Sequence, residues 1–265
     1  MSSLRVTILG CGSSGGVPRI GTMWGQCDAS EPKNRRRRCS LLVEQRKKAG
    51  ATTVLVDTSP DLREQLLSVR AEHLDGVLYT HDHADHTHGI DDLRMVAYAM
   101  KKRIACHFDA ATRDSLVSRF AYCFAQRQGS DYPPILTANE IEPGVALKVA
   151  GGGGDINVLP VPQMHGDIAS LGFRFGKLAY SPDISSLPES SVALLEGLDV
   201  WIVDALRYTP HSSHFSVKQA LAHIERLKPK RAILTHMTSD LDYATLKREL
   251  PAGVEPAYDG MVIEV

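Results

Sequence analysis

Short apolar segments recur along the chain, and several stretches between them repeat apolar residues at the spacing of amphipathic helices. Runs rich in Val, Ile and Leu predict ten strands. They are Arg5–Leu9, Ser40–Glu44, Thr53–Asp57, Gly76–Thr80, Arg103–His107, Ile156–Pro160, Leu171–Phe175, Val200–Asp204, Arg231–Thr235 and Met261–Glu264. Helices are predicted at Pro60–Arg70, Ala110–Gln126, Val217–Leu227 and Asp242–Leu250. Ser59 and Ser216 are the predicted N-caps of the first and third of these helices.

Strands and helices alternate near both ends of the chain, whereas strands cluster in its middle. This order predicts a layered α/β sandwich with mixed sheets. The four glycines at 151–154 indicate a flexible turn between two strands. No linker separates two halves of the chain, so we expect residues 1–265 to form a single domain.

The composition narrows the class of protein. Apolar residues make up 43% and charged residues 23% of the 265 residues, values typical of a globular chain rather than a disordered one. No apolar run approaches the roughly 18 residues that a membrane-spanning helix needs. The N-terminus does not have the basic start and apolar stretch of a signal peptide, so we expect a cytoplasmic protein with reduced cysteines.

The charges nearly balance, with 30 Lys and Arg residues against 31 Asp and Glu residues. A domain that binds long nucleic acid is usually strongly basic, so we do not expect such a partner here. The run Arg35–Arg38 is the local exception. It fits either a solvated loop or a patch that faces phosphate.

A glycine-rich segment follows the first predicted strand. Residues 10–15 satisfy the G-x-G-x-x-G pattern, but Gly16, Val17 and Pro18 follow in place of an amphipathic helix. A dinucleotide site needs the N-terminus of such a helix against the pyrophosphate, so the pattern does not predict a nucleotide cofactor. We expect instead a loop that borders a site and offers backbone amides to an anion.

The densest group of potential metal ligands directly follows the predicted strand Gly76–Thr80. Residues 81–86 read HDHADH and place five ionisable side chains within six positions. A strand that ends in a loop can present alternate side chains on one side, and the turn that follows places Asp85 at the start of a helix. Imidazole nitrogens and carboxylate oxygens suit Zn²⁺ and Mn²⁺, so this segment predicts metal binding.

Single residues of the same types follow other apolar runs. His165 comes shortly after the strand that starts at Ile156, Asp183 follows the run Leu178–Tyr180, and His236 directly follows Arg231–Thr235. Active sites of open α/β sheets lie at strand ends. We therefore expect these residues to converge with the segment 81–86.

In type and order, these residues resemble the metal ligands of the metallo-β-lactamase superfamily. The similarity lies in an H-x-H-x-D-H motif followed by separate His, Asp and His residues, and it extends over nearly the whole chain. That superfamily folds as a four-layer αβ/βα sandwich of two mixed β-sheets, with a dinuclear metal site between the sheets. The resemblance implies the same α/β fold here.

The resemblance also implies roles for individual residues. One divalent metal ion would be held by His81, His83 and His165. A second would be held by Asp85, His86 and His236, with the carboxylate of Asp183 bridging the two. Asp57 resembles the acid that orients a ligand imidazole, which needs an acceptor for its other ring N–H.

Further segments narrow the branch of the superfamily. Four of them resemble PhnP-type phosphodiesterases: Gly10–Pro18, Asn34–Ser40, Asp91–Arg94 and Glu255–Val265. This resemblance implies hydrolysis of small phosphodiesters, including cyclic ribosyl phosphates. Two ions of Zn or Mn would clamp the anion and make a bridging hydroxide available as nucleophile. Asp85 and Asp183 would serve catalysis through these ions, and His214 is favoured as phosphate contact and general acid.

Other reactions use similar ligands. A thioester hydrolase of the glyoxalase II type would carry a C-terminal helical extension, but this chain ends in a predicted strand. An RNA 3′-processing nuclease would fit the run Arg35–Arg38 but would also carry a basic, Gly/Pro-rich arm. A di-iron oxidoreductase typically has Glu at the position of His83. We therefore predict a metal-dependent phosphodiesterase with a small anionic substrate and no membrane partner, and leave a homodimer open.

The remaining thiols and imidazoles carry weaker signals. Cys11, Cys27 and Cys39 leave a structural zinc site open, although the paired C-x2-C motif that would indicate one is missing. Cys106 and Cys123 are expected to pack in the core. Four histidines are not expected to bind metal: His73, His88, His107 and His223. Of these, only His88 is close enough in sequence to support a ligand.

Overall fold

The strands form two seven-stranded sheets in the computed structural model, which describes residues 4–265. The first sheet has the order β14-β1-β2-β3-β4-β5-β6. Its strands are β1 (Leu4–Gly10), β2 (Ser40–Lys47), β3 (Gly50–Val56), β4 (Gly76–Leu78), β5 (Ile104–Phe108), β6 (Leu136–Glu140) and β14 (Val262–Glu264). Its β1–β2 pair is antiparallel and its β3–β4 pair is parallel, so the sheet is mixed.

The second sheet has the order β13-β12-β11-β10-β9-β8-β7 and is also mixed. Its strands are β7 (Leu147–Val149), β8 (Ile156–His165), β9 (Ile168–Phe175), β10 (Leu178–Ser181), β11 (Val200–Asp204), β12 (Arg231–Thr235) and β13 (Val254–Pro256). The central strands β10 and β11 are buried along their whole length. Such strands pair inside a sheet whose two faces are both covered.

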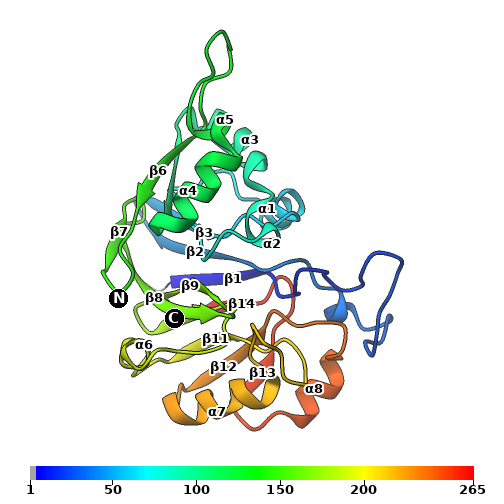
Figure 1. Ribbon diagram of the computed structural model, residues 1–265. Coiled ribbons are helices and arrows are strands. Elements are labelled where there is room, and N and C mark those ends of the chain that lie inside the picture. Colours follow the sequence, from blue (N-terminus) through cyan, green and yellow to red (C-terminus); the bar gives the residue numbers. More distant parts are fainter. Residues whose placement is uncertain (1–3) are drawn as a thin grey trace.

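Helices cover the outer faces of both sheets, so the chain forms four layers (Figure 1). The first sheet carries α1 (Leu62–Val69), α3 (Leu93–Met100), α4 (Ala110–Arg119) and α5 (Ala121–Phe124). The second carries α6 (Glu189–Leu194), α7 (Val217–Leu227) and α8 (Tyr243–Glu249). One apolar cluster joins the two sheets and α7, and a second fills the space between the first sheet and its helices. The predicted αβ/βα sandwich is confirmed.

All ten predicted strands are present, with ends that differ by a few residues. The largest difference is the strand from Ile156, which continues through two prolines to His165. Four strands were not predicted: β6, β7, β10 and β13. Three of these lie at sheet edges, where a short strand needs only one partner and carries little apolar pattern of its own.

Two helix predictions were wrong in part. The stretch Ala110–Gln126 is two helices, because the backbone leaves the helical region at Phe120 (φ −121°, ψ 38°). Ser59 does not cap α1, whose N-cap is Asp61; the Ser59 hydroxyl instead donates to Gln65. One capping prediction holds, and the predicted helix Asp242–Leu250 is present with a shorter range. Ser216 caps α7 in a reciprocal capping box with Gln219, and α8 starts directly after Asp242.

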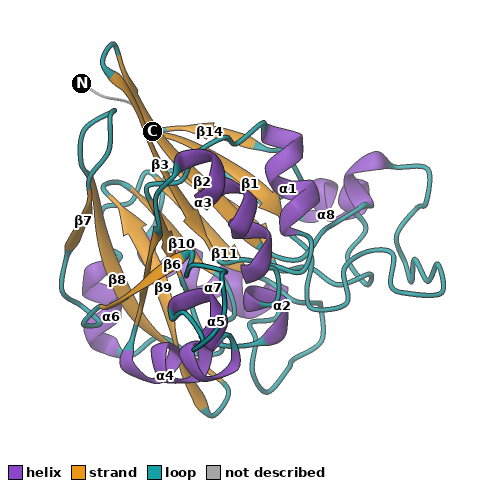
Figure 2. Cartoon of the chain, turned by 90° about the horizontal axis from the view of Figure 1, so that it is seen from above, coloured by secondary structure: helices purple, strands orange, loops and turns teal. Residues whose placement is uncertain are grey.

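The segment between β1 and β2 runs over the surface near α8 (Figures 1 and 2). Arg36 anchors it: this side chain is 2% exposed and donates to the backbone carbonyls of Thr238 (2.9 Å) and Leu241 (2.6 Å). Arg37 pairs with Asp259, and Arg38 pairs with Asp61. Three of the four arginines at 35–38 therefore hold the segment in place through contacts within the protein.

The glycine-rich segment passes close to the same arginines. A Cβ atom at Gly10 would lie 2.0 Å from the carbonyl oxygen of Arg38, so only glycine fits there. The amide of Gly12 donates to the carbonyl of Arg37, and that of Ser13 donates to Met237. These two amides are used within the protein, and binding of an anion by the rest of the loop stays a prediction.

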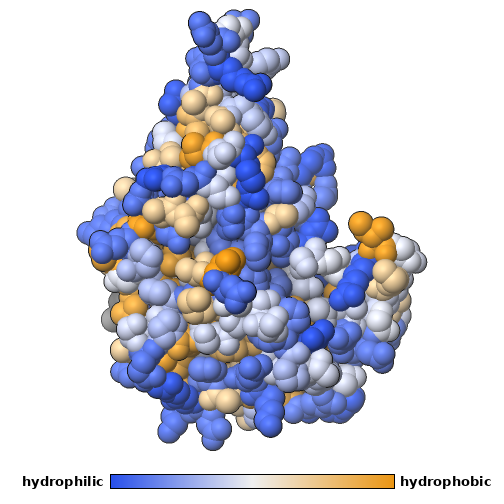
Figure 3. All heavy atoms as spheres, viewed as in Figure 1, coloured by the Kyte–Doolittle hydropathy of each residue, from blue (hydrophilic) through white to orange (hydrophobic). Residues whose placement is uncertain are grey.

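The surface in the view of Figure 3 is largely hydrophilic, with apolar residues in small groups. Across residues 4–265, every helix is too short or too polar to pass through a membrane.

Replacing the buried guanidinium should destabilise the fold. In Arg36→Met, two buried carbonyls lose a charged donor, so we expect the free energy of unfolding to fall by about 3 kcal/mol. Arg35→Met, at the exposed neighbouring position, should change it by less than about 0.5 kcal/mol. Urea denaturation measures both. Equal stability of the two variants would contradict the anchoring role of Arg36.

Candidate metal centre

Seven side chains from both sheets converge between the sheets. In the first sheet, His81 and His83 follow β4, and α2 (Ala84–Thr87) carries the next two. In the second sheet, His165 ends β8, Asp183 follows β10 and His236 follows β12. Two groups of these residues have ligand atoms within 4.8 Å of one another: His81, His83 and His165, and Asp85, His86, Asp183 and His236.

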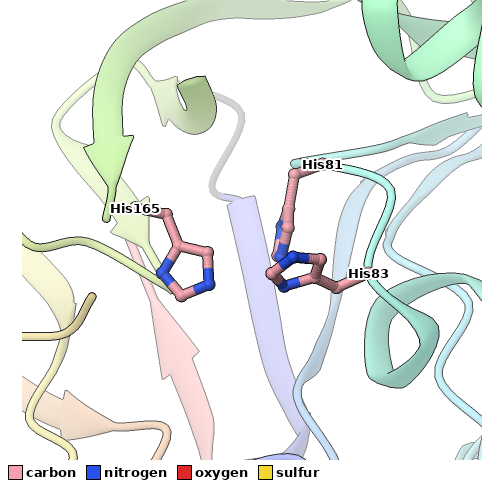
Figure 4. Close-up of side chains that lie close together, drawn as sticks. All are labelled: His81, His83 and His165. Carbon is pink, nitrogen blue, oxygen red and sulfur yellow. The ribbon is translucent and has the colours of Figure 1, made fainter. Parts of the chain in front are cut away.

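The first group consists of three imidazoles. Figure 4 shows His81 and His83 on one side and His165 facing them from the opposite sheet. Their ring centroids lie 4.6 to 5.2 Å apart. His81 and His165 are buried whereas His83 is exposed, so this group opens toward solvent.

The second group contains the carboxylate that reaches both. Asp183 is 2% exposed, and its Oδ2 lies 2.9 Å from Nε2 of His86. Its Oδ1 lies 3.3 Å from Nε2 of His236 and 3.8 Å from Nε2 of His165, which belongs to the first group. The carboxylate therefore lies between the two groups.

Unsatisfied polar atoms show that this donor set fits metal ions. Several buried side-chain atoms have no hydrogen-bond partner among residues 4–265, and four of them are ligand atoms of this centre: Nε2 of His81, His86 and His236, and Oδ2 of Asp183. Even the 2.9 Å contact between His86 and Asp183 lacks hydrogen-bond geometry. Buried polar groups are rarely left without partners, and cations among these atoms would satisfy all four.

The electrostatics of the site favour positive charge. Burial alone lowers the pKa of His86 and His236, but the neighbouring carboxylates outweigh it. Asp183 is the strongest of these and Asp85 adds to it; together with Asp204 they raise the pKa of His236 to about 9. In His81, burial dominates and lowers the pKa. The field that attracts protons to His86 and His236 also attracts divalent cations, so binding of a metal would release those protons.

Outer contacts fix the direction of the ligand imidazoles. Nδ1 of His86 lies 2.7 Å from Oδ2 of Asp57, which also accepts from the Thr80 hydroxyl at 2.8 Å. Nδ1 of His165 donates to the carbonyl of Ser213 at 2.6 Å. Each contact leaves Nε2 free to face the centre. Asp57 thus lies where the sequence predicts the orienting acid.

Three residues of the centre have left-handed backbone angles that non-glycine residues rarely adopt. They are Asp57 (φ 62°), Asp183 (φ 49°) and His236 (φ 58°), and each follows the end of a strand within two residues. Such strain persists only where the surrounding structure enforces it, and it is concentrated at functional sites. Here it turns the chain sharply at the strand end and directs the side chain into the centre.

His214 lies beside both groups. It is 8% exposed, and its Nε2 is 4.0 Å from Oδ1 of Asp183. Its Nδ1 lies 2.7 Å from Oδ2 of Asp204, a fully buried carboxylate that ends β11. Sequence reasoning missed Asp204. The signal was available, since Asp204 is an acid at the end of an apolar strand, as Asp57 is.

The other candidates lie elsewhere. His88 is exposed and packs against Phe120, and His73, His107 and His223 belong to no group of ligand atoms. The thiol of Cys11 contacts Asp259, that of Cys27 contacts backbone carbonyls, and that of Cys39 contacts Thr235. Residues 4–265 therefore contain no set of three ligands that includes a cysteine.

Comparisons with known proteins agree with this architecture. A model of the Beta-lactamase superfamily domain matches residues 52–237. A diphosphatase from the PhnP family is 34% identical, with a TM-score of 0.87 over 100% of this chain and 98% of that one. Zn²⁺-bound PqqB from Methylobacterium extorquens is 17% identical, with a TM-score of 0.75 over 98% and 100% of the two chains, and shows likeness of fold alone.

A further relative is the octanoyltransferase of Porphyromonas gingivalis, which is 32% identical over 265 residues. The match covers 97% of this chain but 51% of the relative. The chain therefore spans about half the length of the relative.

The position of Asp183 between the two groups predicts the metal content. After loading with zinc or manganese, the protein should hold close to two ions per chain, and Asp183→Asn should hold one or fewer because a shared ligand has lost its charge. Elemental mass spectrometry measures this. Asp114→Asn, at an exposed carboxylate of α4, should keep both ions; full occupancy in Asp183→Asn would contradict a bridging role.

Removing the acceptor behind His86 should weaken metal binding without removing a ligand. In Asp57→Asn, the His86 imidazole loses its carboxylate, so we expect the affinity for one ion to fall about 10- to 100-fold. Competition with a chromophoric chelator measures the loss. The matched control is Asp92→Asn at an exposed carboxylate, and equal affinities in the two variants would argue against this support.

Proposed function

This chain belongs to the metallo-β-lactamase superfamily, in a PhnP-like branch, and from that premise we propose that it hydrolyses small phosphodiesters with two divalent metal ions. The observation that carries the proposal is the Asp183 carboxylate, which lies within 4.0 Å of imidazoles from both ligand groups and of His214. The PhnP-family diphosphatase, at 34% identity, supports cleavage of a bond to phosphorus.

Each of the two ligand groups would hold one ion. His81, His83 and His165 would hold one; Asp85, His86 and His236 would hold the other, and Asp183 would contact both. Two such ions neutralise phosphate charge and lower the pKa of a water molecule, which supplies a nucleophile near neutral pH. The exposed edge at His83 leaves access for a substrate from solvent.

The leaving oxygen still needs a proton, and His214 is placed to provide it. Its Nδ1–H is held by Asp204 at 2.7 Å, so Nε2 faces the centre. An imidazolium there would give its Nε2 proton to the departing alkoxide, while the Asp204 carboxylate would stabilise the charged ring. Asp204 acts through His214 and is a positioning residue.

A diphosphate linkage is the second candidate. It is favoured by one observation, the name of the PhnP-family diphosphatase. The same donors would act on it, because a phosphate leaving group also departs with negative charge. Such a leaving group is more stable than an alkoxide and would depend less on His214.

The leaving group therefore provides a test of His214. In His214→Ala, we expect turnover of bis-(p-nitrophenyl) phosphate to fall only a few-fold, because p-nitrophenolate leaves without a proton. Turnover of a diester with an alkoxide leaving group should fall about 100-fold or more. His211→Ala, at a more exposed imidazole nearby, is the control. Equal losses on both substrates would remove the general-acid role.

A substrate screen tests the function itself. Metal-loaded protein is assayed with cyclic phosphodiesters, linear phosphodiesters, diphosphate-linked compounds, S-lactoylglutathione and an octanoyl thioester. Activity on the phosphodiesters that disappears with chelation is the expected result. Hydrolysis of a thioester alone would replace this proposal with an acyl-group reaction.

A further inference from the structure

A hollow separate from the metal centre lies between α3, α5 and the loop that follows α5. Figure 1 shows this loop extending beyond the helices at the top of the view. The hollow has a volume of about 350 Å³. Its wall combines three tyrosines, Tyr98, Tyr122 and Tyr132, with two arginines, Arg94 and Arg127.

The tyrosines give the hollow an unusual aromatic surface. The chain has eight tyrosines, and these three are 38%, 41% and 74% exposed. Aromatic side chains that gather on an open surface usually mark a binding site. Flat ring faces accept the flat face of a nucleobase, with little dependence on which base it is.

The two arginines differ in how their charge is balanced. Arg94 donates to Oδ1 of Asp91 at 2.5 Å and to the hydroxyl of Tyr98 at 3.5 Å, and its guanidinium lies 5.8 Å from the Tyr122 ring centroid. Arg127 is exposed, and no carboxylate in residues 4–265 lies within ion-pair distance of it. The hollow therefore has one cation balanced within the protein and one available for an anion.

Internal hydrogen bonds shape the loop that carries Arg127. The amide of Ser130 donates to the carbonyl of Arg127 at 3.1 Å, closing a turn in which Gly129 has a φ of 77°. The Gln126 side chain donates to the carbonyl of Ser130, whose hydroxyl accepts from the amide of Tyr132. The wall on this side is thus held by its own contacts.

We propose that this hollow binds a nucleotide, with the base against the tyrosines and the phosphate at Arg127. The site is distinct from the metal centre, because the two share no residue. Residues of the hollow are nevertheless close in sequence to residues of the metal centre. Tyr122 is two residues from Phe120, which packs against His88 at the end of α2, and Asp91 is five residues from His86.

Calorimetric titration of the metal-loaded protein with adenosine monophosphate tests the proposal. We expect saturable binding that weakens about tenfold or more in Tyr122→Ala, which removes a stacking face. Tyr122→Phe keeps that face and should bind as the unaltered protein does. Arg127→Glu, on an exposed loop where folding is not at risk, should also weaken binding about tenfold or more. Tyr208→Ala removes an exposed tyrosine outside the hollow and should change nothing.

Further arms separate this site from the proposed hydrolysis. His81→Ala, which disables the metal centre, should leave nucleotide binding intact; binding that is lost there but unaffected by Tyr122→Ala and Arg127→Glu would overturn the proposal. Adenosine and inorganic phosphate, each lacking half of the ligand, should bind more weakly than the nucleotide. A short single-stranded oligonucleotide distinguishes the source: tighter binding than the mononucleotide indicates the end of a nucleic-acid chain. Binding of adenosine monophosphate that does not saturate at millimolar concentration would also overturn the proposal.

Discussion

The carboxylate of Asp183 is buried between imidazoles from both sheets, and its negative charge is the constraint on which the centre depends. The carboxylate lies 2.9 Å from His86, without hydrogen-bond geometry, and 3.3 Å from His236. Nε2 of both imidazoles has no hydrogen-bond partner. A fold that buries such a charge must neutralise it, by protons on the imidazoles or by cations. The acceptors behind His86 and His165 favour cations, since they direct Nε2 of both rings inward.

The two sheets provide the rigidity that this arrangement needs. No ligand belongs to a long loop: His81 and His83 lie in the short connection between β4 and α2, and the others lie within two residues of a strand end or on the one-turn helix α2. The left-handed angles of Asp57, Asp183 and His236 show how the chain leaves each strand to reach the centre. A side chain attached this way moves only if a paired strand moves, so the geometry is set by the packing of the cores on either side.

Features that leave a local pattern in the sequence could be predicted from it. Apolar runs mark the central strands, and residues of metal-ligand type at the ends of these runs mark the centre. The fold and the convergence of the seven side chains could therefore be predicted. The roles of these side chains in binding metal stay predictions. Edge strands such as β7 and β13 could not, because three residues with one partner carry no pattern. The role of Arg36 depends on a backbone carbonyl 205 residues away in the sequence, that of Leu241. The role of Asp204 depends on the imidazole of His214. Residue type alone does not reveal such pairings.

The N-terminal segment gains its meaning from one of these distant contacts. Met237 directly follows His236, and it donates its amide to the carbonyl of Cys11 and accepts from the amide of Ser13. The glycine-rich segment therefore clamps the residue next to a strained ligand. Arg36 binds the carbonyls of Thr238 and Leu241 just beyond. The glycine-rich segment and Arg36 thus hold in place the backbone that carries His236.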